Sequence, residues 1–149
     1  MWYAILGAVL LAGDQILKYW VVTHLAVGES APFLPGFMQL TRLHNYGAAW
    51  SSLSGRTVLL VVFTAVLLAA VALLLIKKVV RHWTGITACT LILSGGIGNI
   101  IDRIVHGYVV DMFDLQLFSY PVFNLADCCV VVGAILGGIY YLFLYEKYD

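Results

Sequence analysis

Residues 57–76 read TVLLVVFTAVLLAAVALLLI, a run of 20 residues without a single charged side chain. A helix needs roughly 20 apolar residues to cross about 30 Å of hydrocarbon, so this segment is long enough to span a bilayer. Of the 149 residues in the chain, 62% are hydrophobic and 11% are charged, against about a quarter charged in an ordinary soluble domain. The run therefore predicts a membrane protein.

Three further apolar runs accompany this segment. They cover residues 1–22, 83–103 and 121–145. Four spans use almost the whole chain as a single membrane domain and leave two longer loops, at 23–56 and 104–120. Four buried core helices of a soluble protein are a much less favourable interpretation in so short a chain. A secretory signal peptide is also disfavoured for the first run, which lacks a basic start and has no small-x-small cleavage site before Asp14.

Basic residues predict the orientation of the chain. The connection at 77–82 reads KKVVRH, and Lys147 lies near the C-terminal end. Short loops rich in Lys and Arg stay in the cytoplasm. Both termini are then cytoplasmic and the two longer loops lie on the outer side, although Arg42 and Arg56 in the first of these loops oppose the bias.

The outer loops carry weak strand signals. Residues 37–43 partly alternate apolar and polar side chains, which is typical of a short strand, and residues 108–110 form a second candidate just before Asp111. Gly and Pro residues mark the rest of the first loop as turns. We therefore expect an all-α membrane protein with four transmembrane helices and a small extracytoplasmic β-sheet and loop region. Asp114 is expected to be a solvated loop residue.

Four aspartates are predicted to meet at the outer ends of the spans. With cytoplasmic termini, Asp14 lies about 13 residues along the first helix, or roughly 20 Å at 1.5 Å per residue, and so in the outer half of the bilayer. Asp102 ends the third span and Asp127 begins the fourth on the same side, with Asp111 in the outer loop between them. Carboxylates are costly in or near hydrocarbon, so such residues usually have a function.

Most of these polar residues also have a structural interpretation. Asp14 and Lys18, at positions i and i+4, can form an intrahelical ion pair as readily as they can contact a substrate. Asp102 beside Arg103 favours a local pair or a network at the helix end. Asn124 is a favoured N-cap for the fourth helix. Close helix approach is predicted where small residues recur, at Gly95, Gly96, Gly98, Gly133 and Gly137.

Asp111 and Asp127 remain as the pair with a chemical role, because neither has a basic residue at helical pairing distance in the sequence. Two neighbouring carboxylates cannot both ionise, so one pKa rises and the pair holds one proton. One carboxylate can then take a proton from water while the other donates to the scissile carbonyl oxygen. This predicts an aspartyl hydrolase with no metal and no cofactor, and the histidines and cysteines show no metal-ligand spacing.

Five motifs in order give the chain a close resemblance to the lipoprotein signal peptidase (signal peptidase II) family, over essentially its whole length. They are Asp14-Gln15-x-x-Lys18, Asn45-Tyr46-Gly47-Ala48-Ala49-Trp50-Ser51, Gly95-Gly96-x-Gly98-Asn99-x-x-Asp102-Arg103, Gly107-x-Val109-Val110-Asp111 and Phe123-Asn124-x-Ala126-Asp127. The resemblance departs from the usual family pattern at three positions, Met112, Trp50 and His44.

This resemblance implies a bacterial inner-membrane protease in which Asp111 and Asp127 form the catalytic dyad. Its substrates are prolipoproteins that carry diacylglycerol on a cysteine, and cleavage falls just before that cysteine. It also implies a set of residues that support or line the site, namely Asp14, Lys18, Asn45, Asn99, Arg103 and Asn124. We expect a monomer among membrane lipids, without a nucleic-acid partner.

Two other classes of protein are compatible with parts of the pattern. A small transporter or assembly factor would explain the intramembrane Asp, Asn and Arg, but not two aspartates at the outer boundary. An intramembrane protease of the presenilin type places its aspartates within two spans, in Tyr-Asp and Gly-x-Gly-Asp contexts that do not occur in this sequence.

Overall fold

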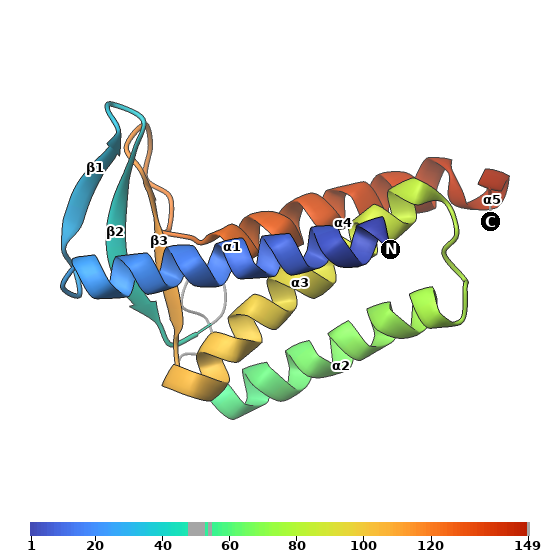
Figure 1. Cartoon of the computed structure of the whole chain (residues 1–149), viewed down its shortest axis with the longest axis horizontal. Coiled ribbons are helices and arrows are strands. Elements are labelled where there is room, and N and C mark those ends of the chain that lie inside the picture. The colour runs from blue at the N-terminus through green and yellow to red at the C-terminus, as the bar shows by residue number, and fades with distance from the viewer. Residues whose placement is uncertain (48–52, 54, 149) are drawn as a thin grey trace.

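The structure, a computed structural model, describes residues 1–47, 53 and 55–148. Four long helices form a bundle, and a small sheet lies across one end of it (Figure 1). The helices are α1 Trp2–His24, α2 Thr57–Ile76, α3 Trp83–His106 and α4 Leu125–Phe143, followed by the short α5 Tyr145–Tyr148. Each of the four long helices is apolar enough to cross a membrane. The predicted fold class is therefore confirmed.

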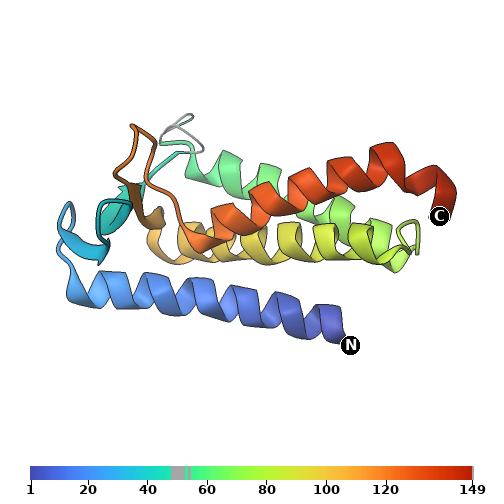
Figure 2. The same ribbon diagram turned by 90° about the horizontal axis from the view of Figure 1, so that it is seen from above.

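Helix α3 is the centre of the bundle, because α1, α2 and α4 all pack against it (Figure 2). Small residues make this packing possible. A Cβ atom added at Gly95 would meet the backbone oxygen of Ala126 on α4, and one added at Gly98 would lie 2.8 Å from the Asp14 carboxylate. Close approach is confirmed at Gly95, Gly96, Gly98 and Gly133. The prediction that Gly137 is needed for close approach is wrong, because a Cβ atom added there would lie at the ordinary contact distance of 3.8 Å from the Ala88 Cβ.

The sheet contains three antiparallel strands in the order β1-β2-β3. Their bounds are Ser30–Leu34, Met38–Asn45 and Val109–Leu115. The two predicted strands thus exist but are longer than expected. The prediction of turns throughout the rest of the first loop is wrong for β1. This strand contains Pro32, which is tolerated at the edge of a sheet where its missing N–H is not needed.

Asp114 shows the largest local departure from the sequence prediction. It lies in β3 and not in a solvated loop. Its Oδ2 accepts hydrogen bonds from Gln39 Nε2 at 2.7 Å and from Thr41 Oγ1 at 2.9 Å. The carboxylate therefore joins two strands of the sheet, a cross-strand contact that the sequence of β3 alone does not reveal.

Arg42 of β2 fastens the sheet to the bundle. Its guanidinium donates to the carbonyl oxygens of Val22 and Leu25 at 3.0 and 2.9 Å. Carbonyls at a helix C-terminus lack partners within the helix, and a cation is favoured there. An arginine that weakened the orientation argument thus has a structural role at the end of α1.

The two ends of the bundle differ in chemistry. Both termini and the connection at 77–82 lie at one end, and the sheet lies at the other (Figures 1 and 2). Lys77, Lys78 and Arg81 belong to the end that carries the termini. The four aspartates predicted to converge all lie towards the sheet end, where contacts between α1, α3, β3 and α4 bring them together.

Candidate active site

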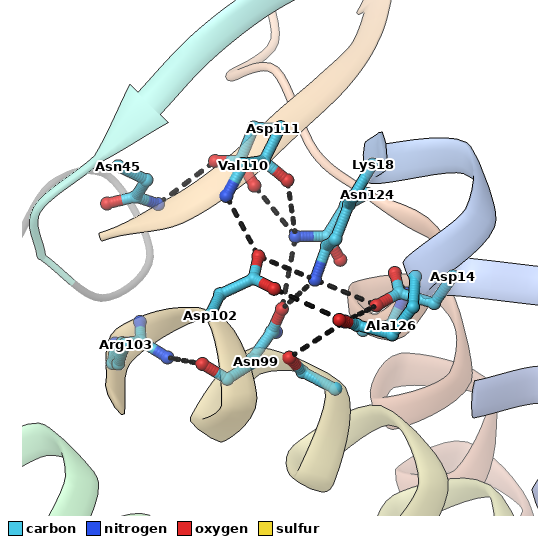
Figure 3. A network of polar contacts seen from close by, with 12 residues as sticks. Asp14, Lys18, Asn45, Asn99, Asp102, Arg103, Val110, Asp111, Asn124 and Ala126 are labelled. Carbon is cyan, nitrogen blue, oxygen red and sulfur yellow. Dashed lines mark hydrogen bonds and ion pairs between the residues drawn. The ribbon is translucent and has the colours of Figure 1, made fainter. Parts of the chain in front are cut away.

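All of the predicted site residues belong to one polar network between the sheet and the helix ends, most of them labelled in Figure 3. They come from α1, β2, α3, β3 and the start of α4. Within the described part of the chain, every buried side-chain nitrogen and oxygen has a hydrogen-bond partner. A satisfied polar network in a low-dielectric setting is rigid, which suits a site that must hold several groups in fixed geometry.

Asp111 is presented by β3 and is almost completely buried, with 3% of its surface exposed. Its Oδ1 accepts from Asn124 Nδ2 at 2.8 Å, and its Oδ2 accepts from Asn45 Nδ2 at 3.1 Å. Asn45 is held in turn by the backbone N–H of Gly47, which donates to its Oδ1 at 2.9 Å. Both carboxylate oxygens of Asp111 are therefore positioned by amides from two different segments.

Asp127 lies in the first turn of α4 and forms a capping box with Asn124. The Asp127 N–H donates to Asn124 Oδ1 at 2.8 Å, and the Asn124 N–H donates back to Asp127 Oδ2 at 3.2 Å. This reciprocal pair starts the helix at Leu125, because it satisfies two backbone N–H groups that have no partner inside the helix. Asp127 Oδ1 also accepts from Asn99 Nδ2 at 2.8 Å.

Asn124 therefore joins the two aspartates. Its side chain has no exposed surface, caps α4 through Oδ1 and donates through Nδ2 to Asp111. The predicted N-cap is confirmed, but helical spacing does not indicate the second contact. Asn99 completes the connection, since its Oδ1 accepts from Asn124 Nδ2 at 3.2 Å and from Lys18 Nζ at 3.1 Å.

Lys18 carries a buried ion pair on each side. Its Nζ lies 2.8 Å from Asp14 Oδ2 and 3.0 Å from Asp102 Oδ2, and these three side chains are 2–4% exposed. The intrahelical pair of Asp14 with Lys18 is confirmed. Of the two alternatives predicted for Asp102, the local pair with Arg103 is wrong, because Asp102 pairs with Lys18 of α1. The network at the helix end is confirmed by its contacts with Lys18 and Val110.

Asp102 is a member of the site that was not predicted to support the pair. Asn99, Asp102 and Arg103 stand at positions i, i+3 and i+4, a spacing that predicts one shared helix face. The Arg103 guanidinium donates to the carbonyl oxygens of Gly47 at 2.8 Å and Asn99 at 3.4 Å. It thus holds the backbone at Gly47, two residues after β2. Trp50 lies outside the described residues.

The other two departures from the family pattern, Met112 and His44, pack against neighbouring side chains. Met112 has no exposed surface and packs in a core cluster with Val21 and Leu40. His44 stacks on Tyr108 with ring centroids 3.8 Å apart. Neither is among the hydrogen-bond partners of the two aspartates within the part of the chain that the structure describes.

The electrostatic setting of Asp111 favours a bound proton near neutral pH. Burial, and then the neighbouring charge of Asp127, raise the pKa of Asp111 from its usual value of 3.8 to about 7. The hydrogen bonds from Asn45 and Asn124 and the positive charge of Lys18 act in the opposite direction. Lys18 is distant from Asp111 in sequence, so helical pairing distance does not reveal this cation.

Both the sequence and the fold are similar to those of known proteins. The sequence profile described as Signal peptidase (SPase) II matches residues 6–143. The lipoprotein signal peptidase of Enterococcus faecalis is 41% identical over 97% of this chain and 89% of its own length, and that of Streptococcus pyogenes is 43% identical over 85% and 84%. A solved bacterial membrane enzyme superposes with a TM-score of 0.89 at 32% identity, covering 99% of this chain and 90% of its own.

Proposed function

Since this chain belongs to the signal peptidase II family, a family of aspartic peptidases, it removes signal peptides from prolipoproteins, and we propose that Asp111 and Asp127 perform the cleavage. The observation that carries the proposal is their shared partner. One buried asparagine, Asn124, contacts a carboxylate from β3 and the first turn of α4, which carries the second carboxylate. Two acids held in this way by separate elements form a pair that can share one proton.

The proposed reaction needs only water and this pair. One carboxylate takes a proton from the water, whose oxygen attacks the scissile carbonyl carbon, while the protonated carboxyl donates to the carbonyl oxygen. The tetrahedral intermediate then collapses: the protonated carboxyl donates to the leaving nitrogen as the C–N bond breaks, and the carboxylate takes a proton back from one hydroxyl of the intermediate as the new carbonyl forms. At the end the pair again holds one proton, so it is ready for the next substrate.

The amide side chains around the pair hold both carboxylates in fixed directions. Asn45 and Asn124 both donate to Asp111, and Asn99 donates to Asp127. These donors fix the direction of each carboxylate before substrate arrives, so little reorganisation is needed during the reaction. Asp127 also lies at the N-terminus of α4, where a negative charge is favoured.

We further propose that both termini are cytoplasmic and that the pair faces the outer side of the membrane. The basic connection at 77–82 lies at the end of the bundle that carries the termini, opposite the sheet. The aspartates then lie at the outer boundary of the hydrocarbon. A cysteine that carries two acyl chains reaches this level by lateral diffusion within the bilayer, which brings the peptide bond before it to Asp111 and Asp127.

The proposal predicts a strong dependence on the lipid of the substrate. In proteoliposomes, a diacylglyceryl-modified prolipoprotein should be cut just before the modified cysteine. The same precursor without lipid should show a kcat/KM at least ~100-fold lower, because acyl chains contribute about 0.8 kcal/mol per buried CH₂ to membrane binding. Mass spectrometry of both products locates the cut. Equal turnover of the two precursors, or a cut elsewhere, would contradict the proposed site of cleavage.

A further inference from the structure

Two buried carboxylates outside the proposed pair hold the backbone next to it. Asp102 Oδ2 accepts from the N–H of Val110, the residue before Asp111, at 3.0 Å. Asp14 Oδ1 accepts from the N–H of Ala126, the residue before Asp127, at 2.9 Å. Each aspartate of the pair thus has one carboxylate fixing the peptide group of the residue directly before it.

These two carboxylates are connected through one ammonium group. Lys18 Nζ contacts Asp14 at 2.8 Å and Asp102 at 3.0 Å. Gln15 Nε2 donates to the same two carboxylates, at 3.2 Å in each case. An unbroken chain of polar contacts therefore runs from the backbone of Val110 to the backbone of Ala126, as Figure 3 shows for its labelled members.

We propose that Asp14, Lys18 and Asp102 form a clamp that fixes the separation of Asp111 and Asp127, and that Asp102 is a positioning residue for the reaction. The inference rests on the proposed function of this pair. The attraction between charged groups is strong where water is excluded, and the members of the clamp are 2–4% exposed. The distance that the clamp spans, from Val110 to Ala126, is set by the packing of α1 on α3. Neither of these helices carries a reacting carboxylate.

The clamp acts in addition to direct contacts between β3, which carries Asp111, and the start of α4, which carries Asp127. Asn124 donates to Asp111 and to the carbonyl of Val110, and Phe123 forms a bridge with Phe113 of β3. Both connections involve residues that precede α4, whereas Asp14 holds the first turn of α4 itself. Loss of the clamp should let the two carboxylates move apart, and a misplacement of about 1 Å can cost 100-fold in rate.

Asp102→Asn tests the clamp, and Asp114→Asn is the matched control. The amide oxygen introduced at position 102 can still accept from Val110, but the ion pair with Lys18 is lost. Asp114 is a carboxylate of strand β3 whose partners Gln39 and Thr41 lie in the sheet. We expect Asp102→Asn to lower kcat by at least ~100-fold with KM changed less than about threefold, and Asp114→Asn to leave both nearly unchanged.

The pH profile of kcat separates positioning from general support of the fold. Two coupled carboxylates titrate as a pair, and the gap between their apparent pKa values shrinks as they move apart. Removal of a nearby negative charge shifts both values in one direction instead. The charged side chains that act on the pair are Asp14 and Lys18 from α1 and Arg103 from α3. We expect a narrower gap in Asp102→Asn and an unchanged gap in Asp114→Asn.

Three outcomes would overturn the clamp. They are a kcat in Asp102→Asn within about threefold of the wild type, an unchanged pKa gap, and equal losses in Asp102→Asn and Asp114→Asn at equal loss of thermal stability. If Asp102→Asn does not fold, Asp14→Asn removes the other ion pair of Lys18, on the side of Ala126, and must narrow the gap in the same way. An active Asp111→Asn variant would instead overturn the proposed pair itself, so the two failures are distinguishable.

Discussion

Replacing Asp111 or Asp127 by asparagine should abolish cleavage of a lipidated prolipoprotein, with a loss of kcat of roughly 10⁴-fold or more. Asparagine has nearly the size of aspartate but can neither take a proton from water nor donate one to the carbonyl oxygen. Because the two carboxylates act as a unit, the double variant should be no less active than either single variant. Turnover of purified protein in proteoliposomes, measured by mass spectrometry, gives these values.

A folded control is essential, since both residues are hydrogen-bonded within the network of the site. Asp114→Asn serves here as well, because Asp114 is an acid of the same strand as Asp111 but binds Gln39 and Thr41. The thermal midpoint of each variant in detergent should stay close to that of the wild type. An asparagine variant of Asp111 or Asp127 that retains turnover within about tenfold of the wild type would rule out its proton-transfer role.

The second large effect concerns stability. Lys18→Met should lower the free energy of unfolding by about 3 to 5 kcal/mol, because it leaves two buried carboxylates without their cation. Asp14 and Asp102 are 1% and 3% exposed, so water cannot replace the lost partner. Reversible unfolding in mixed micelles measures the change. Lys77→Met, at a lysine beyond the end of α2, should alter stability by less than about 0.5 kcal/mol.

A triple variant tests the origin of that loss. Asp14→Asn, Lys18→Met and Asp102→Asn together remove every charge of the clamp while keeping oxygens that accept from Ala126 and Val110. A neutral replacement of a buried ion network costs less than removal of one partner. The triple variant should therefore be more stable than Lys18→Met alone. A triple variant that is less stable than Lys18→Met would show that unpaired charge is not the cause.

The helices could be predicted from the sequence because each apolar run is long enough to cross a bilayer. The strands were harder to predict, since each is short and β3 is distant in the chain from its partner β2. Strand β1 contains Pro32 and, in the described sheet, pairs with β2 alone, so its own residues carry little strand signal. Asp114 was misplaced for the same reason, because its partners Gln39 and Thr41 belong to another strand.

Part of the site could be predicted, because the position of a residue along a transmembrane helix gives its depth in the membrane. Depth along the helices places Asp14, Asp102, Asp111 and Asp127 at the same end of the bundle. Depth does not identify partners across helices, so the neighbour Arg103 was considered as the partner of Asp102 in place of Lys18, its actual ion-pair partner. Helical spacing finds contacts within one element, whereas the packing of α1 on α3 decides this contact.

The shared proton is the central claim, and infrared difference spectroscopy tests it most directly. A titration from about pH 5 to about pH 9 should show the C=O stretch of one protonated carboxyl that is lost near neutral pH. The raised pKa of Asp111, about 7, predicts that this band is absent in Asp111→Asn. In Asp127→Asn it should move to lower pH, because the negative charge that helps to raise the pKa of Asp111 is gone. A band that is unchanged in either variant, or no protonated carboxyl titrating near neutral pH, would contradict the account.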